Sequence, residues 1–149
     1  MTENQAILET IKRLVATASE VDSLLAALVN LLQRERPHFH WVGIYRLEGH
    51  ELVLGPYVGK PTPHTRVPLH QGICGAAAST GQTIVVDDVN KDPRYLACSL
   101  ETRSEIVVPL RHAGKVWGEI DIDSDQPAAF SENDRELLER VAELLGAEL

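Results

Sequence analysis

Two pairs of strand-like segments, each joined by a short glycine-containing link, most restrict what this chain can fold into. The first pair covers residues 40–47 and 51–54, and the second covers 105–110 and 116–123. Links this short close antiparallel hairpins, because a parallel pair needs a crossover of about a dozen residues or more. The sequence therefore predicts a sheet that is built largely from antiparallel neighbours.

Helical patterns bracket this sheet. Apolar residues recur at helical spacing in 6–18, again between a cap at Asp22 or Ser23 and Pro37, and again after Ser131. Between the hairpins we expect strands at 66–69 and 83–87, a small-residue helix at 72–78 that closes near Gly81, and a short helix at 92–98. The fold class expected for residues 1–149 is a single α+β domain. Its terminal helices cover one face of the sheet, and a loop-rich pocket lies on the other.

Composition narrows the function classes. The chain has 149 residues, 44% of them hydrophobic and 24% charged, which suits one globular core. Lys plus Arg number 14 against 22 Asp plus Glu, so a net charge of −8 argues against nucleic-acid binding. We find neither a secretory signal nor an apolar run of the roughly 18 residues that span a bilayer. We therefore expect no membrane partner and a reducing, cytoplasmic location.

Two cysteines are candidates for redox chemistry. Cys98 lies in a polar segment near Arg94 and Arg103, whose charges can lower the pKa of a thiol. Cys74 falls in the first turn of the small-residue helix, where the helix dipole favours a thiolate. Each cysteine can equally be a small buried core residue, so both interpretations stay open at this point.

Acidic and aromatic residues suggest a small-molecule pocket. Asp121 and Asp123 are two apart on a predicted strand and point to one face, and Glu105 opens the neighbouring strand. Three carboxylates around a pocket could bind an ammonium group or keep one acid protonated. Trp41 and Tyr45 share a strand face and could form its walls. The alternatives are a solvated sheet face for the acids and core packing for the aromatics.

Metal-binding patterns are weak. His38 and His40 form a His-x-His pair, but no third ligand stands at a diagnostic spacing. The acids from Asp121 to Glu132 have a calcium-loop spacing, yet Gln126 stands where that loop requires glycine. We therefore expect neither a metal nor another cofactor.

In this order, these segments resemble the free methionine-(R)-sulfoxide reductases, which are single-domain GAF proteins. The resemblance covers roughly residues 38 to 145 and is carried by HWVGIYRL, RVPLHQGICGAAASTGQTIVVDDV, LACSLETRSEIVVPL and GKVWGEIDIDS. It implies a GAF fold with a six-stranded antiparallel sheet. It also implies reduction of free methionine (R)-sulfoxide, with thioredoxin as the reductant and a homodimer as the assembly.

The resemblance also assigns site residues. It makes Cys98 of the L-A-C segment the nucleophile and Cys74 of G-x-C-G a second redox cysteine. The pocket acids and aromatic walls of the family correspond here to Glu105, Asp121, Asp123, Trp41 and Tyr45.

One departure from the family concerns the resolving step. Well-known members carry a third cysteine before the short strand at 66–69, and His64 stands about there in this chain. Cys74 is then the one thiol left to pair with Cys98. The expected mechanism is attack by Cys98 on the sulfoxide sulfur, proton donation by Glu105 or an aspartate, and a disulfide between the two cysteines. The alternative is a GAF sensor of small molecules or oxidants that does not catalyse a reaction.

Overall fold

The computed structural model of the protein describes residues 1–96 and 101–148. Within them, a six-stranded sheet has the strand order β3-β2-β1-β6-β5-β4, and all of its neighbours are antiparallel. The strands are β1 (Trp41–Glu48), β2 (Glu51–Val58), β3 (Arg66–Pro68), β4 (Ile84–Val86), β5 (Ser104–His112) and β6 (Lys115–Ser124). The helices are α1 (Glu3–Thr17), α2 (Val21–Glu35), α3 (Gly72–Thr80), the 3₁₀ helix η1 (Val89–Lys91) and α4 (Glu132–Glu148).

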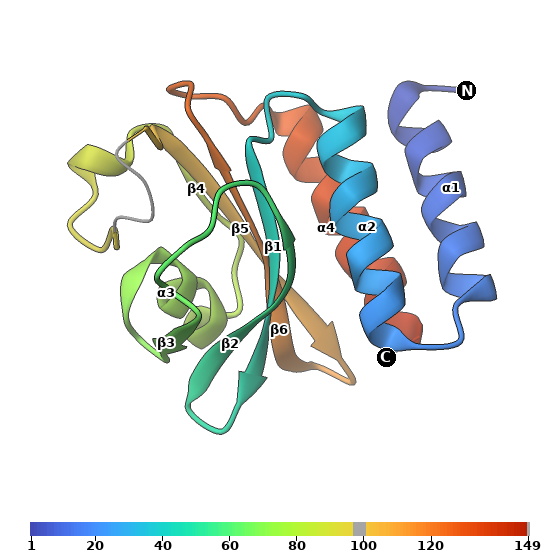
Figure 1. Cartoon of the computed structure of the whole chain (residues 1–149), viewed down its shortest axis with the longest axis horizontal. Helices are drawn as coiled ribbons and strands as arrows, with labels where there is room; N and C mark the ends of the chain where they lie inside the picture. Colours follow the sequence, from blue (N-terminus) through green and yellow to red (C-terminus); the bar gives the residue numbers. More distant parts are fainter. Residues whose placement is uncertain (97–100, 149) are drawn as a thin grey trace.

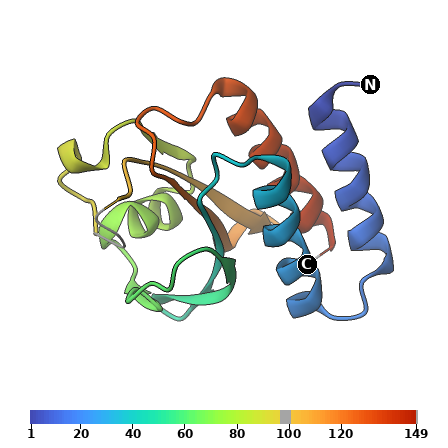
Figure 2. The ribbon, with the colours of Figure 1, turned by 45° about the horizontal axis from the view of Figure 1, so that its top comes forward.

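The layers follow the predicted division of the sheet into two faces. Helices α2 and α4 cover one face, with α1 packed against their outer side, and α3 lies on the other face with β3 and the loops (Figures 1 and 2). The helical side is filled by hydrocarbon, including Leu28 and Leu32 of α2, Leu138 of α4 and Ile120 and Ile122 of β6. This core buries one side of the central strands, and their other side faces α3 and the loops. None of the described helices combines the length and the apolar character needed to cross a bilayer.

Strand β2 is longer than the sequence pattern predicts. The expected strand ends at Leu54, whereas β2 continues through Gly55 and Pro56 to Val58. The pairing of β1 with β2 shifts register in this region, since Gly43 faces Tyr57 while Tyr45 faces Leu54. Proline is tolerated where the ladder is interrupted by such an irregularity. The Gly-Pro pair therefore interrupts the pairing without ending the strand.

The predicted helix at 92–98 is wrong over its described part, residues 92–96. Asp92–Leu96 are non-helical, and the local helix is η1, just before them. The Asp92 side chain accepts hydrogen bonds from the Arg94 backbone at 2.9 Å and from the Arg94 guanidinium. An aspartate bonded to the backbone two residues ahead stabilises a turn in competition with a helix. The remaining residues of that prediction, 97 and 98, lie outside the described residues.

The helix starts are partly as predicted. The last helix has the expected capping box, because the Asp134 N–H donates to Ser131 Oγ at 3.1 Å and the Ser131 N–H donates to Asp134 Oδ2. The predicted caps of α2 at Asp22 or Ser23 are wrong, since its N-cap is Glu20 and no side chain caps it. The Asp22 carboxylate instead pairs with Arg46 on β1.

Candidate active site

Three acids line one side of β6. Glu119, Asp121 and Asp123 alternate with Ile120 and Ile122, so the acids point away from the helical core. All three carboxylates are buried, with side chains between 0% and 4% exposed. The prediction that Asp121 and Asp123 share a face is therefore confirmed. The alternative of a solvated sheet face is wrong.

The strand register brings the other expected pocket residues to these acids. Glu105 on β5 and Trp41 on β1 both stand directly opposite Asp123. Tyr45 stands opposite Glu119. The sheet therefore presents a row of Trp41, Asp123 and Glu105 across three strands, and neighbouring rows contain Asp121 and Glu119.

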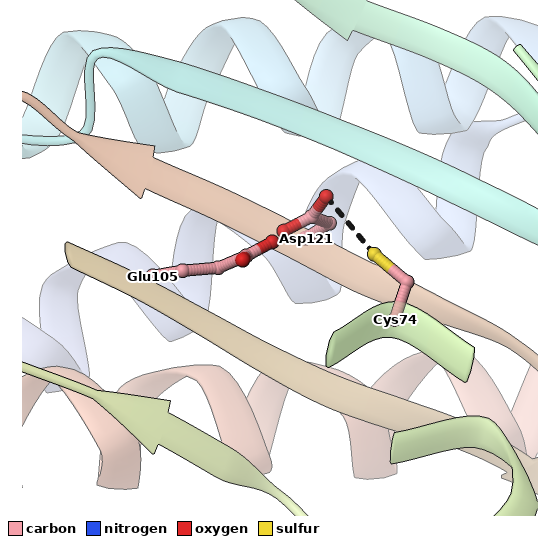
Figure 3. A group of neighbouring side chains, drawn as sticks. All are labelled: Cys74, Glu105 and Asp121. Atoms are coloured by element: carbon pink, nitrogen blue, oxygen red, sulfur yellow. Dashed lines mark hydrogen bonds between the residues drawn. The ribbon is translucent and has the colours of Figure 1, made fainter. Parts of the chain in front are cut away.

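Helix α3 places a thiol over this acidic surface. Its sequence from Gly72 to Thr80 is rich in glycine and alanine, which lets the helix approach the sheet closely. Cys74 in its first turn points to the sheet, and its thiol donates a hydrogen bond to Asp121 Oδ2 at 3.2 Å (Figure 3). The side chains of Glu105 and Asp121 point toward each other from adjacent strands in the same view.

Burial and crowding favour the protonated forms of the acids. Burial, then the charge of Asp121, raises the pKa of Glu119 and of Asp123 well above the ordinary range. Burial also raises the pKa of Asp121, although hydrogen bonds with Glu105 and Cys74 and the nearby His64 oppose that shift. The raised pKa values favour the protonated carboxylic acid, which is the form that can donate a proton.

The expectation that the helix dipole makes Cys74 a thiolate is wrong. Burial, followed by the charges of Asp121, Glu119 and Glu105, raises the pKa of the Cys74 thiol well above its ordinary value. A short helix contributes only a partial positive charge at its first turn, which does not outweigh desolvation and several carboxylates. Cys74 is therefore a neutral thiol that must lose a proton before it can react.

The aromatic residues form the walls that the sequence suggested. Trp41 Nε1 donates to the Lys60 carbonyl at 3.0 Å, and the indole stacks on Tyr57 with ring centroids 5.6 Å apart. The indole also lies over Gly43, where a Cβ atom would stand 2.3 Å from the ring. The Tyr45 hydroxyl donates to the His64 carbonyl at 2.7 Å. Glycine at position 43 is thus required for the indole to lie along the sheet.

Two pockets open on this face of the sheet. The outer pocket encloses about 430 Å³ and is lined by Trp41 and Asp123, together with His40, Lys60, Pro61, Thr62, Glu101, Thr102 and Asp125. The inner pocket encloses about 270 Å³ and is lined by Cys74 and Glu105, together with Tyr45, His64, Val67, Gly72, Ile73 and Leu96. Of the expected residues, Trp41 and Asp123 therefore line the outer pocket and Tyr45, Cys74 and Glu105 the inner one, while Asp121 lines neither.

Comparison with known proteins places this geometry in a family. The GAF domain model matches residues 5–149. The free methionine-R-sulfoxide reductase of Escherichia coli is 37% identical over 126 residues, which cover 82% of this chain and 76% of that protein.

Solved structures agree with this match. The free methionine-R-sulfoxide reductase of Neisseria meningitidis in complex with its substrate superposes with a TM-score of 0.92 at 37% identity, covering 97% of this chain and 87% of that one. The type II enzyme of Thermoplasma acidophilum has a TM-score of 0.83 at 39% identity, covering 92% and 93%. This chain belongs to the GAF-domain family of free methionine-R-sulfoxide reductases.

The family assignment confirms the predicted GAF fold and identifies the chain as an oxidoreductase. The structure brings together the residues expected for a reductase pocket: Trp41, Tyr45, Cys74, Glu105, Asp121 and Asp123. Cys98, the expected nucleophile, lies outside the described residues. The described residues on either side of its segment are Leu96 in the inner pocket and Glu101 in the outer pocket.

Glu119 is the pocket acid that sequence reasoning missed. The signal was present, because Glu119 continues the alternation of Asp121 and Asp123 by one further step. His64 is a second addition to the reductase pocket. It lines the inner pocket, and its charge lowers the pKa of Asp121.

The two histidines of the His-x-His motif point to separate partners. His38 Nε2 lies 2.8 Å from Asp134 Oδ2 at the start of α4. His40 Nδ1 accepts a hydrogen bond at 2.9 Å from the Asp125 backbone after β6. The two histidines therefore hold two separate connections, to the start of α4 and to the segment after β6, and do not form the core of a metal site.

Proposed function

We propose that this protein reduces free methionine (R)-sulfoxide to methionine. The observation that supports this most directly is the buried row of Trp41, Asp123 and Glu105, with Cys74 and Asp121 immediately beside it. It combines carboxylates, an aromatic wall and a thiol in a chain related to reductases of this class.

The outer pocket suits a small zwitterion with a sulfur-containing side chain. It combines an apolar wall, Trp41, with the buried carboxyl group of Asp123. The Trp41 indole offers an apolar surface for the methyl and sulfur atoms. Asp123, in its ionised form, is placed to bind the ammonium group. A methionine sulfoxide within a peptide has no such ammonium, and this favours the free amino acid.

The chemical step we propose uses Cys98 as the nucleophile. Its sulfur attacks the sulfoxide sulfur while a carboxyl group, that of Glu105 or of one of the two aspartates, donates a proton to the oxygen. The sulfur–oxygen bond breaks and methionine leaves, reduced by two electrons. As methionine leaves, the oxygen passes from the substrate sulfur to the Cys98 sulfur, so a new sulfur–oxygen bond forms and Cys98 becomes a sulfenic acid, oxidised by two electrons. Burial raises the pKa of Asp121 and of Asp123, and this supports a proton-donor role for one carboxyl of the group that includes Glu105.

The recycling step we propose uses Cys74. Its sulfur attacks the Cys98 sulfenic acid, a disulfide forms, and the hydroxyl leaves as water. Asp121 is placed to accept the thiol proton, because its Oδ2 already accepts the Cys74 hydrogen bond. Thioredoxin then reduces the disulfide by thiol exchange. We further propose a reducing, cytoplasmic location and a homodimer, which size-exclusion chromatography with light scattering would test.

The reaction is tested with free methionine (R)-sulfoxide and a thioredoxin system. We expect turnover by the wild-type protein and none by Cys98→Ser, since serine cannot carry the oxygen through a sulfenic acid. The (S)-sulfoxide and a peptide-bound substrate serve as controls. Wild-type turnover by Cys98→Ser would remove Cys98 from the mechanism. Tight binding of the substrate with no turnover by the wild-type protein would favour the sensor function.

The role of Cys74 is tested by the single-turnover behaviour of Cys74→Ser. We expect one methionine per protein molecule, followed by a stall with thioredoxin, because no disulfide can form. A small thiol should restore cycling by reducing the sulfenic acid directly. Normal cycling of Cys74→Ser with thioredoxin would show that Cys74 does not resolve the intermediate.

A further inference from the structure

Three side chains from different elements converge beneath the inner pocket. Donor atoms of Cys74 on α3, Glu105 on β5 and Asp121 on β6 all lie within 4.8 Å of one another (Figure 3). Each of these residues is less than a tenth exposed. Zinc–sulfur and zinc–oxygen bonds place tetrahedral donors on the order of 3.5 Å apart, so this group is already nearly compact enough for one ion.

A fourth acid, Glu119, lies beside this group without a compensating cation among the described residues. Glu119 is fully buried, and neither of its carboxylate oxygens has a hydrogen-bond partner among the described residues. Asp121 Oδ1 and Asp123 Oδ1 are also buried and also lack a hydrogen-bond partner among the described residues. Across the described chain, these three acids form no salt bridge with Lys or Arg. Buried carboxyl oxygens without hydrogen-bond partners are costly, and a bound cation would offset that cost.

The substrate does not explain all of these acids. Asp123 lines the outer pocket, where the ammonium of an amino acid can reach it. Asp121 and Glu119 line neither the outer nor the inner pocket, so they lie behind the walls that the substrate would contact. A single small ion entering past Cys74 and Glu105 could reach them.

We propose that Cys74, Glu105 and Asp121 form a Zn²⁺ site, with Glu119 supplying further negative charge beside it. A thiolate with carboxylates suits zinc, whereas Mg²⁺ and Ca²⁺ prefer sites made only of oxygen. Three protein ligands leave one position for water. Sequence spacing did not suggest this site, because the first ligand, Cys74, and the second, Glu105, are 31 positions apart and each ligand comes from a different element.

Metal binding exchanges protons for the ion. The Cys74 S–H bond breaks, its proton leaves to solvent, and a zinc–sulfur bond forms. No electron is transferred in this exchange. Zinc would weaken Cys74 as a nucleophile toward a sulfenic acid and would prevent Glu105 from donating a proton, so it would also inhibit the proposed reductase. That consequence rests on the proposed function, whereas the metal site itself does not.

The direct test measures Zn²⁺ binding to the reduced full chain by competition with a chromophoric chelator. We expect one zinc per chain, with proton release in a weakly buffered solution. Co²⁺ in place of Zn²⁺ should give a sulfur-to-cobalt charge-transfer absorption, which reports a bond to a cysteine. Absence of stoichiometric zinc binding, or a cobalt spectrum without that absorption, would overturn the proposal.

Matched variants locate the site. Cys74→Ser should lose the charge-transfer absorption, and Asp121→Asn and Glu105→Gln should each weaken zinc binding at least about tenfold. Cys98→Ser and Asp125→Asn should bind both metals as the wild type does, since neither residue belongs to the proposed site. Circular dichroism establishes that each variant is folded. If Cys74→Ser does not fold, the two carboxyl variants and Cys98→Ser still decide the question.

Activity measurements with zinc distinguish the proposed metal site from the proposed reductase function. If the chain reduces methionine sulfoxide, zinc should slow cycling with thioredoxin and leave the first turnover of Cys74→Ser unaffected. If the chain has no reductase activity, the binding and spectroscopic results still stand alone. Zinc inhibition of equal strength in Cys74→Ser would place the inhibiting ion elsewhere and overturn the assignment.

Discussion

The two faces of the central sheet are made from the same strands and have opposite chemistry. On the helical face, Ile120 and Ile122 of β6 pack with Val42 and Ile44 of β1 in hydrocarbon. On the pocket face, the intervening positions of β6 are buried acids beside Cys74. The pocket face has an apolar cluster of its own, which includes Ile73 and Val107. Along β6, however, burial is favourable in itself only for the isoleucines, because burying a carboxyl group costs free energy.

This difference separates stability from function within single strands. Apolar burial against α2 and α4 holds the sheet together, at about 25 cal/mol per Å² of apolar surface removed from water. The pocket face buries carboxyl groups that raise each other's pKa values. Substitutions one residue apart on β6 should therefore have opposite effects.

The largest effect is expected from Ile122→Ala on the helical face. Ile122 is fully buried, so the substitution should lower the free energy of unfolding by about 2–5 kcal/mol. Asp123→Asn, its neighbour on the pocket face, is the matched control and should not destabilise the protein, because a neutral amide avoids a buried charge. Urea unfolding of both variants measures the contrast. Equal losses of unfolding free energy in Ile122→Ala and Asp123→Asn would contradict the proposed difference between the two faces.

A smaller effect is expected from Gly43→Ala. The added Cβ would stand 2.3 Å from the Trp41 ring, so the indole must move, at a cost of about 1–3 kcal/mol in stability. We expect a change in Trp41 fluorescence in a Trp117→Phe background and weaker substrate binding. In a Trp41→Leu background the stability cost should shrink, since the clash is removed. An unchanged cost there would show that the strain lies elsewhere.

The smallest effect is expected in the pH dependence of stability. The pKa of Glu119 is higher in the folded chain than in the unfolded one, because burial disfavours its charge. Its contribution is therefore fully present below the unfolded pKa, near 4, and is lost as the pH rises toward the folded pKa. Glu119→Gln should flatten the decline of Tm between pH 5 and pH 7.5 relative to wild type. Glu132→Gln on α4 is the control, and an equal flattening there would contradict the assignment.

Much of the fold could be predicted from local patterns. Alternation identified the two hairpins, and helical spacing identified the terminal helices. Predictions from local patterns were wrong where a side-chain hydrogen bond or a shift in strand register overrode the expected helix or strand end. The Asp92 side chain stabilised a turn in place of a helix, and the register shift beyond Leu54 let β2 continue through a Gly-Pro pair.

The sequence predicted which residues form the candidate site better than it predicted their pKa values. The period of two along β6 is enough to place Asp121 and Asp123 on one face, and the same rule would have found Glu119. The register that sets Glu105 opposite Asp123 depends on long-range pairing, and periodicity does not supply it. The pKa direction of Cys74 was mispredicted, because the helix dipole is a local feature and burial is not.

The sequence by itself determined which residues of each strand could face together, because the side-chain period of a strand is a local property of the backbone. It also determined the mixture of acids, thiols and aromatics available to a pocket. Only the tertiary structure decided that Cys74 meets Asp121 from 47 residues away. Packing α3 over the sheet removes water from both groups at once, and that loss of solvation sets their protonation and hence the chemistry they can perform.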